Sequence, residues 1–346
     1  MADRVRINLG LQGGGAHGAF TWGVLDRLLE EETLEITGIS GTSAGALNGA
    51  ALKAGLIEGG PEGARDRLSW LWRQIGALDH PSLPGWMLAW LPDPGLVSRG
   101  VQYASPYAWA ESLTRMVSPY SWGPFYRNPL ERIVDQLDFD HVCAKTGPAF
   151  YVGATCVRDG KIRVFEGHAI TTPAILASAC LPTLFQAVEL PDPKTGVTEA
   201  FWDGGYTGNP ALFPLFAPHL PDDILIVNIN PLVRDDTPVT PPEIQNRINE
   251  ISFNASLLRE LRAIDFVQRL QENGKLDPGA MKSPRIHMIA DDPLMNKLSV
   301  ATKTLPLPGV LAQLKEAGRR AAGRFLHDHL TDIGKRQSAD LRAMFQ

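Results

Sequence analysis

The amino-acid sequence predicts an α/β fold, a three-layer α/β/α sandwich around a mainly parallel central sheet, with an inserted cap segment. In residues 5–56 the pattern of a strand, a glycine-rich turn and a helix occurs twice, which is typical of parallel strands joined by crossover helices. Further strand-like apolar runs follow at 149–156, 224–229 and 285–290. With 346 residues, 44% of them hydrophobic, the chain can bury one large core. We therefore expect residues 1–346 to form a single domain.

The first strand–turn–helix unit covers residues 5–30. Residues 5–11 suit a buried strand, and the run from Gly13 to Gly18 suits a tight turn that another group approaches closely. Helical spacing of apolar residues then predicts a helix over 19–30, with Phe20, Val24, Leu25, Leu28 and Leu29 on one face.

The second unit contains a candidate nucleophile. Residues 34–40 predict a strand and residues 46–56 an alanine-rich helix, and Gly41-Thr-Ser43-Ala-Gly45 between them fits G-x-S-x-G. Gly41 and Gly45 allow a sharp turn that exposes Ser43 above the sheet, next to the positive end of a helix. The alternative is a serine that only caps the helix.

The glycine-rich turn has two functional interpretations. Backbone N–H groups of Gly13, Gly14 and Gly15 suit an oxyanion hole, because a substrate carbonyl approaches them without meeting side chains. Gly13-x-Gly15-x-x-Gly18 also fits a dinucleotide-binding fingerprint. That site requires an acidic residue at the end of the second strand, whereas Glu35 lies at its start. A purely structural turn is the third possibility.

A serine nucleophile needs a base, and Asp203 is the candidate. It ends a short apolar run and precedes Gly204 and Gly205, which let another backbone come close. The alternative is an ordinary Asp-Gly turn between strands.

Taken in order, these motifs resemble the patatin-like phospholipase family. The glycine loop, the Ser43 turn and Asp203-Gly204-Gly205 all match, and residues 177–182 match more loosely. The resemblance extends from the first strand to Pro210. It implies a Ser43–Asp203 dyad, an oxyanion hole at Gly13, Gly14 and Gly15, and hydrolysis of lipid esters of the phospholipase A or lysophospholipase type through an acyl-enzyme. Phospholipid as the substrate class follows from the resemblance alone.

Histidines raise two further points. The family often has Arg or Lys at the position of His17, and a histidine replaces that cation only when it is protonated. His17 is therefore a supporting residue, and its neutrality would weaken a preference for anionic headgroups. His168 and His219 lie nearest Asp203 in sequence and are the candidates if the site is a triad instead of a dyad.

Residues 80–128 are the predicted cap or lid. They contain many prolines and glycines together with Trp86, Trp90, Trp109 and Trp122. Aromatic-rich loops suit acyl-chain binding and peripheral contact with a membrane. The alternative is an insertion whose tryptophans pack into the core.

Residues 242–346 are expected to form a helical and strand extension packed on the same domain. A long helix is predicted over 242–271, followed by a strand at 285–290 and a closing helix at 310–330. In the long helix, Ile244, Ile248 and Ile251 begin an apolar line that predicts the buried face. Its charged residues are expected on the solvated face: Arg247, Glu250, Arg259 and Arg262.

Composition limits the classes of partner. With 33 basic and 38 acidic residues the net charge is −5, and no basic run favours nucleic acid. Three cysteines match no metal motif and suggest free thiols in a reducing compartment. No signal peptide or bilayer-spanning stretch is visible, so we expect a cytoplasmic protein without metal or organic cofactor, whose contact with a membrane is peripheral. A catalytically idle lipid-binding or interaction protein on the same fold remains the functional alternative.

Overall fold

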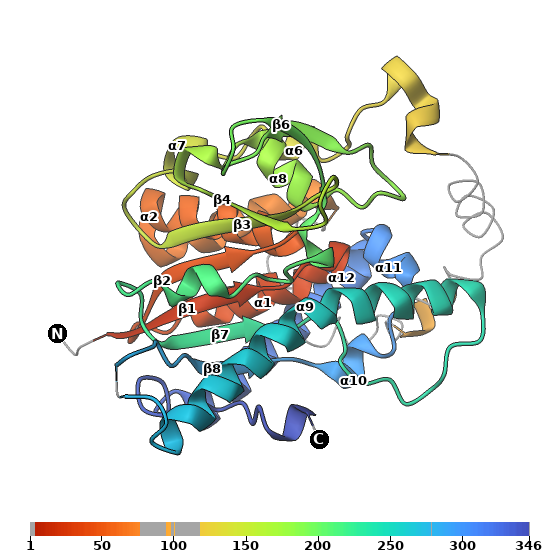
Figure 1. Ribbon diagram of the computed structural model, residues 1–346. Helices are drawn as coiled ribbons and strands as arrows, with labels where there is room; N and C mark the ends of the chain where they lie inside the picture. The colour runs from red at the N-terminus through yellow and green to blue at the C-terminus, as the bar shows by residue number, and fades with distance from the viewer. Residues whose placement is uncertain (1–3, 77–94, 98–99, 101–117, 278, 346) are drawn as a thin grey trace.

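The computed structural model describes residues 4–76, 95–97, 100, 118–277 and 279–345. Over these residues an eight-stranded sheet runs through the molecule, with helices on both sides (Figure 1). The predicted sandwich is therefore confirmed. The strands are β1 (Val5–Leu11), β2 (Leu34–Gly41), β3 (Ala149–Cys156), β4 (Ile162–Glu166), β5 (Val188–Pro191), β6 (Thr198–Asp203), β7 (Asp223–Val227) and β8 (Arg285–Ile289).

The sheet is mainly parallel, as predicted. Its order is β5-β6-β3-β2-β1-β7-β8, and β4 pairs with β3 outside this path. All pairings from β3 through β2, β1 and β7 to β8 are parallel. Antiparallel pairings occur only at the other side of the described sheet, where β4 and β6 pair with β3, and β5 with β6.

Helices cover both faces because the central strands are apolar on both. Leu225 and Val227 of β7 pack into the core under α1, α2 and α12, while Ile224 and Ile226 point to the core under α9. The longer helices are α1 (Gly18–Leu28), α2 (Ala44–Ile75), α8 (Thr172–Ser178), α9 (Pro241–Glu272) and α12 (Pro308–His329). The shorter ones are α6 (Glu131–Val134), α7 (Phe139–Val142), α10 (Asp292–Met295) and α11 (Val300–Thr304).

The helix after the Ser43 turn is longer than predicted. The expected segment 46–56 is only the first part of α2, which continues to Ile75 across a break at Gly59 and Gly60. These glycines have non-helical dihedral angles and precede Pro61. They interrupt the helix at this point but do not end it. No helix in the described part of the chain is long and apolar enough to cross a bilayer.

The orientation of the first half of α9 corrects the sequence-based prediction, whereas Leu261 and Ile264, further along the predicted apolar line, are buried as expected. Ile244, Ile248 and Ile251, expected in the core, are 42%, 53% and 54% exposed, and Glu250, expected in solvent, is fully buried. Arg259 and Arg262 are exposed, as predicted, while Arg247 is half-buried. Helical spacing identifies residues that share a face but not which face turns inward. Here the polar side turns inward because it meets other buried polar groups, described below.

The predicted cap lies mostly outside the described residues, including the side chains of Trp86, Trp90, Trp109 and Trp122. Of residues 80–128, the structure describes 95–97, 100 and 118–128. A short 3₁₀ helix, η2 (Pro119–Phe125), is anchored on the loop before β5. The hydroxyl of Tyr120 accepts a hydrogen bond from Ala187 N (3.0 Å), and that of Tyr126 accepts one from Gln186 N (3.2 Å).

Candidate active site

Ser43 stands at a sharp turn between β2 and α2. Its backbone has φ 55° and ψ −122°, and it is the only described non-glycine residue with positive φ. This conformation is costly for a residue with a side chain and is typical of a nucleophile elbow. Gly45 is required here because a Cβ on it would lie 2.1 Å from the carbonyl oxygen of Leu11. A Cβ on Gly41 would lie 2.5 Å from the oxygen of Gly45.

The elbow is held in place by Ser178 at the end of α8. The backbone N–H of Ser43 donates a hydrogen bond to Ser178 Oγ (2.9 Å). The Ser178 hydroxyl in turn donates to the carbonyl oxygen of Gly153 in β3 (2.7 Å). Ser178 thus connects the candidate nucleophile to the sheet, and both serines are buried.

Asp203, at the end of β6, is a fully buried carboxylate. Its Oδ1 accepts a hydrogen bond from Gly205 N (2.8 Å), while its Oδ2 has no partner among the described residues. Burial raises the pKa of Asp203 to about 7, and the Gly205 N–H and the Ser43 hydroxyl oppose this rise. The Ser43 hydroxyl therefore lies near the carboxylate, although the two do not form a hydrogen bond of normal geometry.

The register of β3 explains why Ser43 and Asp203 meet. Along one edge of β3, Val152 pairs with Gly41 at the end of β2, and Ala154 pairs with Asp203 at the end of β6. The other edge is occupied by β4. Strands β2 and β6 therefore approach each other end to end along the same edge, with Gly153 between them. A Cβ on Gly204 would lie 2.2 Å from the Gly153 oxygen, so the approach leaves no room for a side chain.

The glycine loop after β1 lies against the elbow. A Cβ on Gly13 would lie 2.6 Å from the Cβ of Ser43. The N–H of Gly13 is already bonded to Asn209 Oδ1 (2.6 Å), whereas those of Gly14 and Gly15 have no partner in the described part of the chain. Gly15 has φ 59° and begins a short 3₁₀ helix, η1 (Gly15–His17), so its N–H is a free helix-start donor.

Comparison with known proteins assigns this arrangement to a family. A family model of patatin-like phospholipases matches residues 9–216, which is more than half of the chain. The chain belongs to the patatin-like phospholipase family. This match contains the glycine loop, the Ser43 elbow and Asp203.

Two solved structures that match this chain are distant from it in sequence. VipD from Legionella pneumophila is 14% identical with a TM-score of 0.41, over 95% of this chain and 68% of that one. The ExoU–SpcU complex from the type III secretion system of Pseudomonas aeruginosa gives 19% identity and a TM-score of 0.28, over 73% of this chain. This chain spans about half of that second structure's length (51%). No curated protein matches the chain.

Side-chain amides hold the glycine loop in place. Gln12 Oε1 accepts hydrogen bonds from the backbone N–H groups of Ile229 (2.9 Å) and Asn230 (3.1 Å). Asn230 Nδ2 donates to the Gly13 oxygen (2.7 Å), and Asn254 Nδ2 on α9 donates to the Asn230 oxygen (3.3 Å). These bonds satisfy backbone groups that leave the sheet, and they explain why the first half of α9 turns polar side chains inward.

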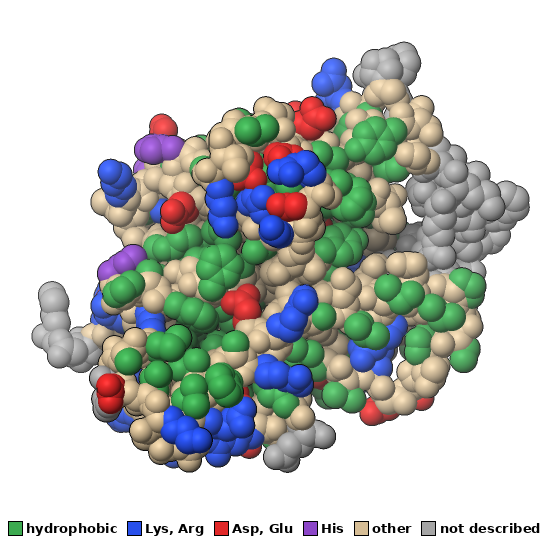
Figure 2. Space-filling view, in the orientation of Figure 1, with side chains coloured by type: hydrophobic (Ala, Val, Ile, Leu, Met, Phe, Trp, Pro, Cys, Tyr) green, Lys and Arg blue, Asp and Glu red, His purple; other side chains and the backbone are tan. Residues whose placement is uncertain are grey.

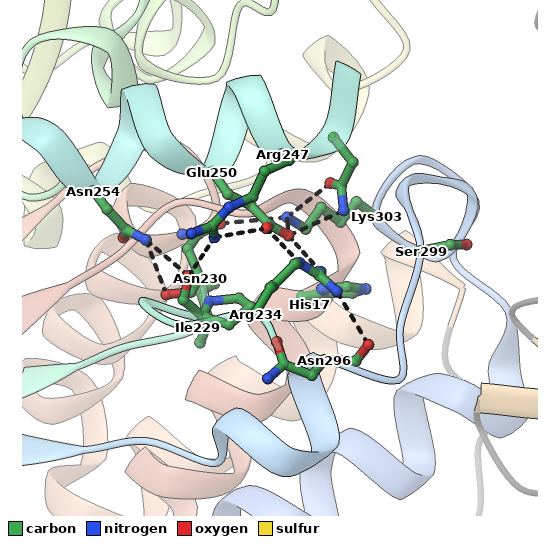
Figure 3. Close-up of polar contacts among 12 residues, drawn as sticks. His17, Ile229, Asn230, Arg234, Arg247, Glu250, Asn254, Asn296, Ser299 and Lys303 are labelled. Atoms are coloured by element: carbon green, nitrogen blue, oxygen red, sulfur yellow. Dashed lines mark hydrogen bonds and ion pairs between the residues drawn. The ribbon is translucent and has the colours of Figure 1, made fainter. Parts of the chain in front are cut away.

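A charged cluster lies behind the same loop (Figure 3). Glu250 of α9 forms a bidentate pair with Arg234 (2.7 Å for both bonds) and an ion pair with Lys303 of α11 (3.2 Å). These cations hold the pKa of Glu250 at about 2, although burial alone would raise it. The backbone of Lys303 also packs against Gly15, where a Cβ would lie 2.3 Å from the Lys303 oxygen. The cluster therefore connects α9 and α11 to the glycine loop.

His17 is neutral in this environment. Burial lowers its pKa well below the ordinary value, and the positive charge of Lys303 lowers it further. Thr302 Oγ1 donates to the Ser299 oxygen (2.9 Å), so it accepts from His17 Nε2–H (2.9 Å). His17 Nδ1 is buried without a partner among the described residues. His17 thus packs behind the loop, and Lys303 and Arg234 carry the positive charge in this region.

The other sequence-based candidates are not brought to the site. His168 and His219 are exposed, and no hydrogen bond connects either to Ser43 or Asp203 in the part of the chain that the structure describes. Glu35 pairs with Arg6 at the start of the parallel strands, the end opposite the glycine turn. Among the described residues, no group of three or more His, Cys, Asp or Glu side chains could hold a metal ion. The three cysteines are free and buried.

Several supporting residues were not identified from the sequence. They are isolated polar residues that belong to no periodic pattern: Gln12, Asn209, Asn230, Glu250, Asn254 and Lys303. Asn209 and Ser178 do lie in segments that the family resemblance covers. Their place in these segments was the only feature of the sequence that pointed to Asn209 or Ser178.

Proposed function

We propose that this protein is a serine acyl hydrolase that cleaves carboxylic ester bonds of lipids, of the phospholipase A or lysophospholipase type. Ser43 is the nucleophile and Asp203 its base. The single observation that carries the proposal is the end-to-end approach of β2 and β6 on β3, which brings a strained serine to a buried carboxylate with an unpartnered oxygen. Family membership supports the lipid substrate class.

The environment of Asp203 suits it for proton transfer at neutral pH. An ordinary carboxylate is a weak base, but a pKa of about 7 makes Asp203 a stronger one while leaving it ionised in part. In the first step, Asp203 Oδ2 takes the proton from Ser43 Oγ as Oγ bonds to the ester carbonyl carbon. Collapse of the tetrahedral intermediate breaks the ester C–O bond, and the departing alkoxide receives that proton. Water then attacks the acyl carbon while Asp203 takes a proton from it, the bond from this carbon to Ser43 Oγ breaks, and Asp203 returns the proton to Oγ as the carboxylic acid leaves.

The oxyanion hole in this proposal consists of the N–H groups of Gly14 and Gly15. Both are unbonded in the described structure, whereas the Gly13 N–H is committed to Asn209. Gly13 instead places its backbone against Ser43. One such donor typically contributes about 10²–10³ in rate, so two free donors suit this role.

The proposal is tested by treating the folded protein with a fluorophosphonate probe and locating the adduct by mass spectrometry. We expect one adduct, on Ser43, that is absent in Ser43→Ala and forms much more slowly in Asp203→Asn. Glu260→Gln is the matched control. Glu260 is a half-buried carboxylate whose pKa is likewise raised to about 7, but it accepts hydrogen bonds from the N–H groups of Leu212 and Phe213.

Each outcome separates one alternative from the proposal. Equal labelling of Asp203→Asn and the parent chain would remove Asp203 from the mechanism. No labelling of the folded parent, with and without detergent micelles, would favour the catalytically idle lipid-binding protein. A parent that is labelled at Ser43 and hydrolyses phospholipid or lysophospholipid would leave the cleaved position as the next question.

A further inference from the structure

The outward side of α9 carries an apolar line that no described residue covers. Ile244, Ile248 and Ile251 each have 42% or more of their surface exposed. Their spacing places them on one line along the helix. Single exposed apolar side chains are ordinary on protein surfaces, but three aligned isoleucines form a continuous strip, which is typical of a contact surface.

Basic side chains continue this line toward the end of α9. Arg259 and Arg262 are exposed, and no ion pair involves either one within the described ranges. Arg262 lies over the ring of Phe345 (4.8 Å to the centroid), and Phe266 follows with 54% of its surface exposed. In Figure 2, green side chains gather over the right-hand end of α9 and blue ones lie along it toward the lower left. The line is thus apolar first and cationic further along.

The opposite side of the same helix supports the active site. Phe253 packs against Tyr206 (5.2 Å between ring centroids) and contacts the Gly205 region next to Asp203. Ser256 Oγ accepts a hydrogen bond from Asn209 N (3.1 Å). An α-helix is about 10 Å across, so the outer line lies roughly that far from the residues that hold the Asp203 loop.

We propose that the outer line of α9, defined by Ile244, Ile248, Ile251, Arg259 and Arg262, docks this protein on an anionic lipid surface. Apolar residues followed by unpaired arginines on one helix side are typical of helices that lie in a membrane interface. Arginines there gain from anionic headgroups while their stems cover apolar surface. At about 1.5 Å per residue, the line from Ile244 to Arg262 is about 27 Å long, so it offers an extended contact to a surface. The proposal rests on the proposed lipid substrate, because docking here brings the Ser43 site close to that surface.

The test is sedimentation of the full chain with vesicles of phosphatidylcholine, with and without phosphatidylserine. The chain carries Ser43→Ala so that the lipid stays intact. We expect binding to vesicles that contain phosphatidylserine. Ile248→Ser with Ile251→Ser should weaken it at least about tenfold. Arg259→Gln with Arg262→Gln should weaken it about tenfold or more on the anionic vesicles only, and high salt should reproduce that loss.

Two controls separate this proposal from the proposed hydrolase activity. Met281→Ser removes another exposed apolar side chain (51%) outside the line and should bind like the parent. With Ser43 intact, the isoleucine and arginine variants should hydrolyse a soluble short-chain ester at the parent rate. Vesicle binding without any ester hydrolysis would reject the enzyme and keep the docking surface.

Three results would overturn the docking proposal. One is absence of binding to the anionic vesicles, and another is equal binding of the parent and the isoleucine variant. The third is a parent dimer, detected by light scattering, that Ile248→Ser with Ile251→Ser dissociates. In that case the outer line is a contact between two copies of the chain.

Discussion

The backbone N–H of Gly13 donates a 2.6 Å hydrogen bond to the side-chain oxygen of Asn209. Asn209 returns a longer bond from its Nδ2 to the Gly13 oxygen (3.4 Å). One amide side chain after β6 thus satisfies both backbone groups of the residue that contacts Ser43. The orientation of the glycine loop depends on this pairing.

Asn209→Ala is therefore expected to impair the site through its effect on Gly13. It leaves the buried N–H of Gly13 without a partner, which costs about 1–3 kcal/mol. The loop can then turn its donors away from the oxyanion, so kcat for a soluble ester should fall while KM changes little. Steady-state kinetics and urea unfolding measure the two effects. Unchanged kcat with lowered stability would limit Asn209 to a structural role.

Substitution of Asp203 should change how stability depends on pH. Its pKa is about 7 when folded and 3.8 as an ordinary carboxyl, so the folded state binds more protons between these values. The stability of the parent therefore decreases as pH rises through this window. Asp203→Asn carries no such charge and should gain on the order of a few kcal/mol relative to the parent between pH 4 and pH 8. Urea unfolding at both pH values measures this gain, and a difference independent of pH would contradict the raised pKa.

The same ionisation predicts the activity profile of the parent. In the proposed mechanism Asp203 acts as base only when it is deprotonated, so kcat/KM for an uncharged ester should rise as pH increases through about 7 and then level off. Initial rates over this range, corrected for spontaneous hydrolysis, provide the measurement. A profile that is flat between pH 5 and pH 9 would exclude Asp203 as the titrating base.

The backbone of Ser43 should be strained, and replacing Ser43 by glycine should relieve that strain. At φ 55° and ψ −122° a side chain is unfavourable, whereas glycine adopts such angles readily. Both Ser43→Ala and Ser43→Gly should be inactive, but the glycine variant should be about 1 kcal/mol or more stable than the alanine variant. Thermal or urea unfolding of the two variants tests this. Equal stability would mean that the elbow is unstrained.

The Glu250 cluster should behave as one unit. Glu250→Gln leaves the half-buried Arg234 and Lys303 without their counter-charge, and we expect a loss of about 3 kcal/mol. Lys303→Met should cost less in that background than in the parent, which a double-mutant cycle measures. In the parent, the contribution of Glu250 is present above its ordinary pKa of 4.5 and is lost as pH falls toward 2. Additive losses would show that the two residues act independently.

Much of the fold can be predicted from the sequence because each glycine-rich turn depends on residues that are close together in the chain. The turns at Gly13–Gly18 and at Gly41–Gly45 each need small residues at particular positions, and the strands and helices beside them have a clear period. From the sequence, a functional pairing of Ser43 with Asp203 is implied only by the family resemblance. Their meeting depends on the register of β3, which no local pattern encodes.

The orientation of α9 was beyond sequence analysis for a different reason. Its isoleucine line and its Glu250–Asn254 line are both continuous, and hydrophobicity alone selects the first as the buried face. The second is buried because Arg234 and Lys303 pair with Glu250, while Asn254 bonds the backbone after β7. Those partners lie far away in the chain, so the reason for burying a polar face appears only in three dimensions.

The shared edge of β3 also has an evolutionary consequence. Backbone pairing sets the spacing between the ends of β2 and β6, so the segments that connect these strands do not determine it. Insertions, deletions and exchange of those segments can alter what enters the site without displacing the reacting groups. Selectivity and chemistry can therefore diverge separately within this architecture, as long as Gly153 and Gly204 keep the two strand ends in contact.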